Sequence, residues 1–422
     1  MNSTIETRAT DGSAGARGPA PYYRDELYGL LSRARLENPV YYDPELDYWI
    51  VTRYADVIAI LNDQENYTAE NVTQRPIPMH PDGMRILEEG GFSPSPSQAS
   101  IAPPHHTRIR AATNAILNIK TFAVLEADIR RLTIEALDRL EGHSRVDLLA
   151  DFTYELPAQV IFLVLGIPSQ DTQNVKRWAG NRTLIDFSPS TYEQQIEGAK
   201  GLVQYWKYCK SMVQDRMENR RGDFTSRLLD WRNGDDAILT LNEIATLTYS
   251  LMFAGHETTT NQLTNAFREL MIQRQAWDAI CADPSLVPNA VEEMFRLVGS
   301  VIHWRRRTRR EVELAGIRLP AGANIMLSFA GANRDGSVFP EPDRADVGRA
   351  NARRHLSLGS GIHVCAGAQL ARLEMKIVFE EMTRRYPDMH LAPGAPVEHL
   401  HTYVFRAPTS LWVDLGKPRL PN

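Results

Sequence analysis

Cysteine is scarce in this chain of 422 residues, which has only Cys209, Cys281 and Cys365. Three widely spaced cysteines fit neither a disulfide framework nor the paired ligands of a structural zinc site. Their scarcity favours a reducing compartment, and we expect a cytoplasmic protein.

Long apolar runs are also missing. No stretch reaches the roughly 18 apolar residues that a membrane-spanning helix needs, so no membrane association is expected. Residues 1–20 are rich in Ser, Gly and Ala and lack the apolar core of a signal peptide, which predicts a disordered lead-in. The formal charge is −5, from 52 acidic and 47 basic residues. Because nucleic-acid binding needs a basic surface, it is not expected as a general function.

The remaining composition is that of a globular enzyme, with 43% hydrophobic and 23% charged residues. Neither an internal repeat nor a linker divides the chain, so residues 21–422 are predicted to form one domain, mainly α with a minor β portion. Residues 41–63 predict strand, turn, strand and helix. Residues 71–104, with many Pro and Gly, predict a long irregular segment. Residues 109–280 are mostly helical, and residues 312–345 and 385–417 contain short strands.

Cys365 lies where a glycine-bent loop is predicted to enter a helix with apolar spacing at Leu370, Leu373 and Ile377. The N-terminus of a helix offers unpaired N–H groups and a positive dipole end, which favour a thiolate, a soft ligand suited to iron. On its own, a lone cysteine is more often a small buried hydrophobic residue. The interpretation therefore rests on the setting of Cys365.

That setting, Leu358-Gly-Ser-Gly-Ile-His-Val-Cys365-Ala-Gly367, resembles the heme-binding loop of the cytochrome P-450 family, FGxGxHxCxG. The resemblance implies the family's fold, with heme b between a long central helix and the helix that follows the cysteine. It implies that Cys365 is the axial ligand of the iron. The further heme contacts that it implies in this loop are Gly359, Gly367, His363 and His355. Leu358 replaces the family's usual phenylalanine, so the redox tuning of the iron is expected to differ.

Three other segments resemble the same family. Residues 240–260 predict a long helix with a capping box at Thr240 and Glu243, followed by Ala254-Gly-His-Glu257-Thr258. A run of threonines is a poor helix former and predicts a local distortion, which alone would be a tolerated defect. The family's AGxET motif implies that Ala254 lies at the heme, and that Thr258 and Glu257 deliver protons to bound oxygen. Because peroxide-driven relatives commonly lose this pair, its presence favours reductive oxygen activation.

Glu293-Met-Phe-Arg296 resembles the ExxR helix of the family, which pairs with a later arginine, here Arg349. We expect these three residues to support folding and heme retention rather than chemistry. The segment Pro103-Pro-His-His106-Thr-Arg-Ile-Arg110 resembles the family's PPxHTRxR motif, which implies that His106 and Arg110 contact the propionates. Without the other motifs, the ExxR pattern would indicate a common surface ion pair, and the Pro-Pro segment would indicate a helix start with basic surface residues.

The basic run from Arg305 to Arg310 resembles the family in one position, Arg306, which implies a propionate contact. The other basic residues are interpreted as a solvated strand edge rather than as a nucleic-acid site. Alignment with the family also predicts an apolar and aromatic substrate pocket, with Arg75, Arg85 and Arg406 as candidates to meet an anionic group. The predicted pocket residues are Ser250, Phe253, Ala254, Val301, Ile302, Val404 and Phe405.

The resemblance extends from about Tyr41 to Trp412. The chain is also similar to the oxygenase part of bacterial self-sufficient members. The resemblance implies a monooxygenase that inserts one atom of O2 into a small organic substrate, with an aromatic compound as the candidate, by hydroxylation or O-dealkylation. Electrons are expected from a ferredoxin or flavodoxin with its reductase, docking at Arg353, Arg354, Arg372 and Lys376, or from a fused reductase absent from this chain. A peroxide-driven peroxygenase and a non-catalytic heme-thiolate sensor are the alternatives.

Overall fold

The computed structural model describes residues 26–75 and 78–419. The lead-in predicted for residues 1–20 lies outside the described residues. The helices are α1 (Leu27–Glu37), α2 (Tyr54–Asn62), α3 (Pro81–Glu89), α4 (His105–Ile116), α5 (Ile119–Ala123), α6 (Glu126–Asp138), α7 (Leu156–Leu165), α8 (Thr172–Phe187), α9 (Tyr192–Glu218), α10 (Phe224–Arg232), α11 (Leu241–Ile272), α12 (Arg274–Ala282), α13 (Val287–Val298), α14 (Phe329–Ala332) and α15 (Ala368–Arg385). The strands are β1 (Val40–Asp43), β2 (Tyr48–Val51), β3 (Tyr67–Thr68), β4 (Arg145–Asp147), β5 (His303–Thr308), β6 (Val312–Leu314), β7 (Ile317–Leu319), β8 (Asn324–Ser328), β9 (His390–Leu391) and β10 (Trp412–Asp414).

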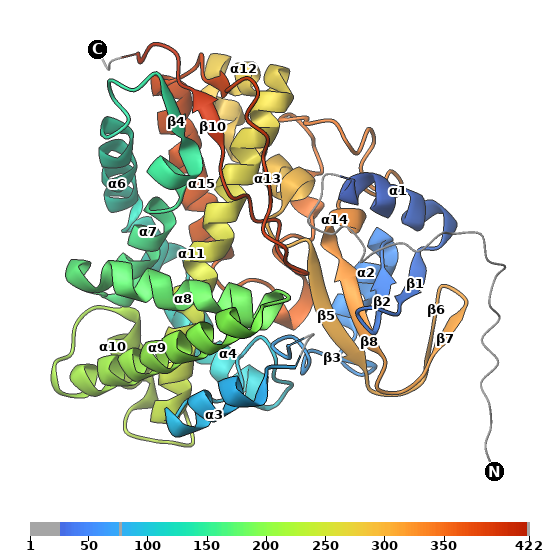
Figure 1. The fold of residues 1–422 in the computed structure, drawn as a ribbon, viewed down its shortest axis with the longest axis vertical. Coiled ribbons are helices and arrows are strands. Elements are labelled where there is room, and N and C mark those ends of the chain that lie inside the picture. The colour runs from blue at the N-terminus through green and yellow to red at the C-terminus, as the bar shows by residue number, and fades with distance from the viewer. Residues whose placement is uncertain (1–25, 76–77, 420–422) are drawn as a thin grey trace.

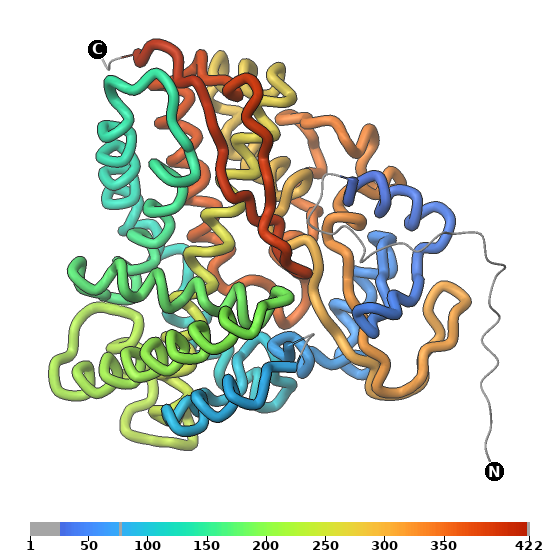
Figure 2. The backbone as a smooth tube through the Cα atoms, viewed as in Figure 1, coloured from blue at the N-terminus to red at the C-terminus, as the bar shows by residue number. Residues whose placement is uncertain are grey.

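The molecule divides into a helical part and a smaller β part, with α11 running through the middle (Figure 1). The larger sheet has the order β1-β2-β8-β5-β3, in which only β2 and β8 are parallel. The C-terminal segment runs back from the helical part to the centre of the molecule, as the red tube in Figure 2 shows. This architecture confirms the predicted fold class, mainly α with a minor β portion. That residues 21–422 form a single domain remains a prediction.

The strand, turn, strand and helix predicted near the N-terminus are present as β1, β2 and α2. Asp43 explains the turn between the strands, since its Oδ1 accepts hydrogen bonds from the backbone N–H groups of Glu45 and Leu46, at 3.1 and 3.2 Å. The predicted helix breaks at Gly142, Gly166 and Ser188 also fall between helices. No described helix is long and apolar enough to cross a membrane.

The prediction that residues 71–104 are irregular throughout is wrong, because α3 lies within them. Pro81 occupies the first turn of α3, where a missing N–H is tolerated, and the His80 side chain caps the helix by accepting from Asp82 N at 3.2 Å. The helix packs against α9, and its Leu87 is buried with Leu202 and Val203. Tertiary packing therefore outweighs the local proline signal.

Helix α11 begins as predicted, with a reciprocal capping box between Thr240 and Glu243. The expected distortion at its threonines is absent, since the helix is continuous from Leu241 to Ile272. Thr258 and Thr259 donate their hydroxyls to the carbonyls of Ala254 and Gly255, one turn earlier, at 2.7 and 3.2 Å. Contacts with α7, α9, α13 and α15 bury the helix and offset its weak intrinsic propensity.

Candidate active site

The loop before α15 places Cys365 three residues ahead of that helix, close to its N-terminus. The Cys365 N–H donates to the carbonyl of Leu358 at 2.8 Å, which closes the loop on itself. Gly359 and Gly361 adopt φ values of 73° and 70°, which favour glycine, and a Cβ on Gly361 would lie 2.6 Å from the carbonyl oxygen of Leu61. The local sequence therefore dictates the position of the thiol.

Cys365 lines an internal cavity of about 280 Å³, and the opposite wall is formed by α11. From α11 the cavity receives Ser250, Ala254 and Thr258. Residues more than a hundred positions apart in the sequence thus face one another across a single cavity. Other residues from the predicted set that line it are Arg110, Val301, Arg306, Gly359, His363 and Gly367, together with Leu358.

Burial raises the pKa of the Cys365 thiol, while the Gly367 N–H and the guanidinium groups of Arg110 and Arg372 act in the opposite direction. The Gly367 N–H near the helix N-terminus therefore favours a thiolate, in the predicted direction, but burial of the sulfur outweighs it in the protein alone. A thiolate here needs a further positive charge at the sulfur. A coordinated metal ion provides one, because it deprotonates a ligating thiol.

Cationic and hydrogen-bonding side chains converge at one end of this cavity. Burial lowers the pKa of Arg306 to about 10 and that of His363 to about 3. The ring of His106, which does not itself line the cavity, lies 4.5 Å from the His363 ring. Among the described residues, no carboxylate pairs with Arg306 or Arg110, and His106 Nε2 and His363 Nδ1 have no hydrogen-bond partner.

Buried polar groups of this kind need partners, and a buried cation needs an anion. The cavity therefore fits a group whose carboxylates would pair with these cations and whose metal ion would bind the sulfur of Cys365. Glu374, which sequence reasoning missed, also lines the cavity, and burial raises its pKa to about 8. A lone glutamate in a helix gives no sequence signal for such a position.

His355 is not at this cavity, which corrects the prediction that it contacts the heme. Its Nε2 lies 3.1 Å from Glu292 Oε2, and Arg372 donates to the same carboxylate at 2.7 and 3.1 Å. The ring stacks on Phe295, with centroids 5.4 Å apart. The loop bends between His355 and His363, so only His363 reaches the cavity.

The AGxET segment places Thr258 at the cavity and Glu257 against α8. The Thr258 hydroxyl donates to the Ala254 carbonyl at 2.7 Å. Glu257 Oε1 lies 3.2 Å from His256 Nε2, and a Cβ on Gly180 would lie 3.6 Å from the same oxygen. The Glu257 carboxylate therefore lies beside α8, at ordinary contact distance from position 180.

Lys176, one turn before Gly180 in α8, adds a positive charge near Glu257. Its Nζ lies 3.6 Å from the centre of the Tyr154 ring, and burial lowers the pKa of Lys176 to about 8. Burial alone opposes ionisation of Glu257, yet His256 and Lys176 together hold the pKa of Glu257 below its usual value. The carboxylate is therefore poised in its ionised form.

Four of the predicted pocket residues do not line this cavity: Phe253, Ile302, Val404 and Phe405. Phe253 and Phe405 pack with Phe187, their ring centroids 5.9 and 5.0 Å from it. Ile302 is fully buried, and its N–H donates to the Val404 carbonyl at 2.8 Å. These residues form the wall behind the pocket, which corrects the prediction that they form its surface.

The ExxR residues form a fully buried ion pair. Arg296 donates from Nε and Nη2 to the two carboxylate oxygens of Glu293, each at 2.7 Å, and both side chains are 0% exposed. Arg349 donates to the same carboxylate at 3.0 and 3.1 Å. Arg296 also donates to the Asn333 carbonyl at 2.9 Å, so the network joins α13 to the segment after α14.

The basic run is not a solvated strand edge, because β5 lies inside the sheet between β8 and β3. Arg305 and Arg306 are buried, on opposite faces of the strand. Arg307 is half-buried and donates to Asn324 of the neighbouring β8 at 3.1 Å. Arg305, Arg306 and Arg307 therefore serve the interior of this chain, whereas Arg309 and Arg310 lie beyond the end of β5 and are exposed, as predicted.

Comparison with known proteins matches this fold and site to one family. The cytochrome P450 family model matches residues 170–399. Vitamin D(3) 25-hydroxylase of Pseudonocardia autotrophica is 31% identical over 83% of this chain and 83% of that protein. The structure of cytochrome P450 CREJ in complex with (4-ethylphenyl) dihydrogen phosphate has a TM-score of 0.90 and 34% identity, covering 94% of this chain and 99% of that one. An intact type IV self-sufficient monooxygenase has a TM-score of 0.91 and 32% identity, covering 95% of this chain and 52% of that one.

A cavity with a cysteine on one wall and cations at one end defines a class of protein, the heme-thiolate enzymes. The chain belongs to the cytochrome P450 family and is a monooxygenase of that family, with heme b as its cofactor.

Proposed function

We propose that this chain oxidises a small aromatic substrate, with Cys365 as the axial ligand of the heme iron and with electrons from a separate redox partner. The observation that carries the proposal is that Cys365 and Thr258 line the same cavity, and Glu257 immediately precedes Thr258 in the sequence. The similar protein CREJ was solved with (4-ethylphenyl) dihydrogen phosphate, a small aromatic compound, which supports this size and type of substrate.

The propionates are assigned to the cationic end of the cavity, at Arg110, Arg306, His363 and, beside it, His106. Gly359 and Gly367 leave room for the heme at the loop. Ala254 is the residue of α11 assigned to contact with the heme on the opposite wall. Bound heme supplies the site for activating dioxygen, and the thiolate promotes cleavage of the O–O bond.

Two side chains of α11 are assigned to proton delivery. Thr258 presents its hydroxyl to the cavity while bonded to Ala254, so its oxygen is held in one place. Glu257, ionised and stabilised by His256 and Lys176, is assigned to carry protons inward from α8. General acid catalysis by positioned groups typically accelerates a reaction by about 10²–10⁴-fold. Glu293, Arg296 and Arg349 are assigned to retention of the heme, not to chemistry.

The redox partner is proposed to be a ferredoxin or flavodoxin that docks on the cysteine-loop side. Arg353 and Arg354 are assigned to that side, and 78% of the Arg353 side chain is exposed although its Nε lies 3.2 Å from Glu292 Oε1. Arg372 and Lys376, assigned to the same face, already pair with acidic residues of this chain. Complementary charge speeds such encounters. A reductase fused to a longer form of the chain is the alternative source of electrons.

The experiment is turnover of small aromatic compounds by the holoenzyme under three conditions: NADH with a ferredoxin and its reductase, hydrogen peroxide alone, and neither. The proposal predicts product only with NADH and the redox partner. Product with peroxide alone would identify a peroxygenase. Absence of product under every condition, with a spectral response to small ligands, would identify a sensor.

A further inference from the structure

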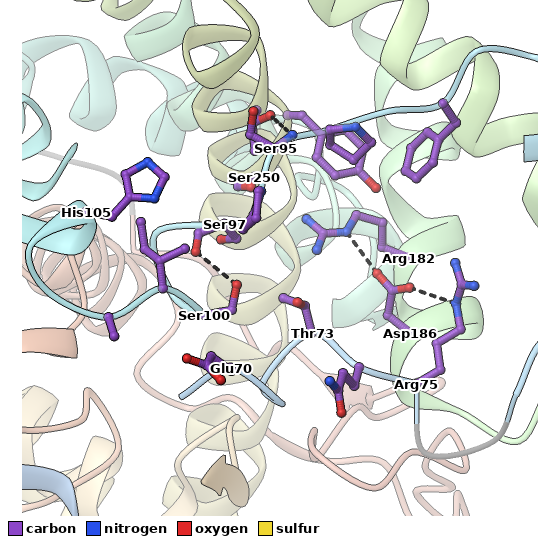
Figure 3. A pocket seen from close by; sticks show the side chains of 18 of the residues that line it. Glu70, Thr73, Arg75, Ser95, Ser97, Ser100, His105, Arg182, Asp186 and Ser250 are labelled. Atoms are coloured by element: carbon purple, nitrogen blue, oxygen red, sulfur yellow. Dashed lines mark hydrogen bonds and ion pairs between the residues drawn. The ribbon is translucent and has the colours of Figure 1, made fainter. Parts of the chain in front are cut away.

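A second cavity has a volume of about 1080 Å³, and Figure 3 shows side chains that line it. It is lined by the segment before α4, by α8 and by the first half of α11. Ser97 and Ser250 line both cavities, so the two meet at these serines. The larger cavity therefore borders the heme cavity at Ser250, about two turns of α11 before Thr258.

Two arginines in this cavity share a single carboxylate. Arg75 donates from Nε to Asp186 Oδ1 at 3.4 Å, and Arg182 donates from Nε to Asp186 Oδ2 at 3.2 Å, as the dashed lines in Figure 3 show. The remaining contacts of Arg75 are weak, from Nη1 to the sulfur atoms of Met79 and Met84. Within the described residues, Arg182 has no other hydrogen bond. Both guanidinium groups therefore keep their Nη donors for a ligand.

Arg305 adds a third positive charge behind the cavity wall. It is 1% exposed, and its Nη1 donates to the carbonyls of Val72 and Gln74, the latter a lining residue. Its Nε and Nη2 are buried without a hydrogen-bond partner in the part of the chain that the structure describes. The Asp186 carboxylate also stabilises the positive charge of Arg305, which burial opposes.

Three guanidinium groups around one carboxylate leave a local charge of +2. Glu70 also lines the cavity, but it is 57% exposed and lies 3.9 Å from Arg309. An uncompensated buried charge is costly, so the cavity favours a ligand with a negative charge of matching size. A phosphate monoester carries about −1.5 to −2 at pH 7 and accepts two-pronged bonds from arginine.

Arg182 is also fixed in direction. Its guanidinium carbon lies 4.6 Å from the centres of both the Tyr249 and the Phe253 rings. Phe253 precedes Thr258 by five residues of α11, which is about 7.5 Å along the helix axis. One aromatic ring with a short substituent spans that distance.

We propose that Arg182 and Arg75 bind the phosphate of an aromatic phosphate monoester, which directs the far end of its ring toward Thr258. This inference rests on the proposed oxidation of a small aromatic substrate. Arg182 and Arg75, which lie outside the heme cavity, then select the substrate. The phosphate anchors the substrate and does not react.

The test is calorimetric titration of the ferric holoenzyme with four ligands of one shape: 4-methylphenyl phosphate, 4-methylphenyl sulfate, 4-methylbenzoate and 4-methylphenol. The phosphate is expected to bind at least about 10-fold more tightly than the phenol, the scale of one charge-assisted hydrogen bond. Equal affinity for phosphate and phenol would overturn the proposal. Tighter binding of the benzoate or the sulfate than of the phosphate would overturn the choice of a phosphate.

Variants separate the anchor from a general effect on folding. Arg182→Gln is expected to weaken phosphate binding by about 10- to 100-fold and to leave phenol binding unchanged. Asp186→Asn, which removes the competing carboxylate, is expected to tighten phosphate binding, an effect that misfolding does not produce. Arg85→Gln is the control, because Arg85, a candidate anion contact from the sequence, does not line either cavity, is 63% exposed and pairs with Asp82 at 2.7 Å. Equal effects of these changes on phosphate and phenol would contradict the inference.

Calorimetry also keeps this inference apart from the proposed function. Tight, Arg182-dependent phosphate binding without NADH-dependent product would leave the anchor standing and overturn the oxidation. Product from neutral aromatic compounds, with no tighter binding of the phosphate, would support the oxidation and overturn the phosphate anchor.

Discussion

Thr258 Oγ1 donates a hydrogen bond of 2.7 Å to the carbonyl oxygen of Ala254, and both residues line the heme cavity. The bond holds the hydroxyl oxygen in place on the wall opposite Cys365. It therefore gives the proposed proton delivery a defined atom, which substitution can remove.

Thr258→Ala is expected to uncouple the reaction. Without the hydroxyl, protons reach bound oxygen at the wrong position, so NADH consumption continues while product per NADH falls by about 10-fold or more. The measurement is the ratio of product and peroxide to NADH consumed. Thr258→Ser, which keeps the hydroxyl, is the control and should remain coupled. Full coupling in the alanine variant would count against the role of Thr258.

Lys176→Met is expected to change the pH profile of coupled turnover. The positive charge of Lys176 lowers the pKa of Glu257, so its removal raises that pKa, and the acidic limb of the profile moves to higher pH. In the unaltered protein Lys176 loses its proton near its pKa of about 8, and the variant should lack this alkaline transition.

The control for Lys176 is Lys210→Met. Lys210 also lies over an aromatic ring, that of Trp206 at 5.8 Å, but it is exposed on α9. Its substitution should leave both limbs in place. Identical profiles for Lys176→Met and the unaltered protein would remove Lys176 from the proposed proton path.

Glu293→Gln is expected to destabilise the protein strongly. It leaves the buried guanidinium groups of Arg296 and Arg349 with a neutral partner, and breaking a buried ion pair typically costs about 3–5 kcal/mol. Urea unfolding and the heme content of the purified protein measure the effect. Glu341 pairs with Arg344, and its side chain is 69% exposed, so Glu341→Gln should change the free energy of unfolding by less than about 1 kcal/mol. Equal stability of the two variants would contradict the assignment.

Reversing the charge of Arg353 and Arg354 is expected to slow ferredoxin-supported turnover at low salt, while binding of small ligands stays unchanged. The matched control is Arg318→Glu on the β6–β7 hairpin, because Arg318 and Arg353 are both 78% exposed. The difference should shrink as salt screens the charges. Equal rates for the double variant and the control at low salt would locate the docking surface elsewhere.

Features set by neighbouring residues were predictable from the sequence. The capping box of α11 and the Asp43 turn depend on contacts within three residues. The position of Cys365 depends on glycines in its own loop. The helix breaks at Gly142 and Gly166 have the same local origin.

Features set by distant contacts were not predictable. Arg75 meets Asp186 across 111 positions, and the Arg182 and Asp186 pair has the spacing of an ordinary surface ion pair. His355 is turned toward Glu292 by a bend that its sequence spacing from His363 does not reveal. The burial of Arg305 depends on β5 lying inside the sheet, which only the pairing with β3 and β8 establishes.

The most direct test of the account is the absorption spectrum of the reduced carbon monoxide complex of Cys365→Ser, beside Cys281→Ser as the control. Cys281 is half-buried on α12, away from the cavity. The account predicts that the Cys281 variant keeps the long-wavelength Soret band of a thiolate-ligated heme and that the Cys365 variant loses it. Retention of that band in Cys365→Ser would contradict the assignment of Cys365 as the iron ligand.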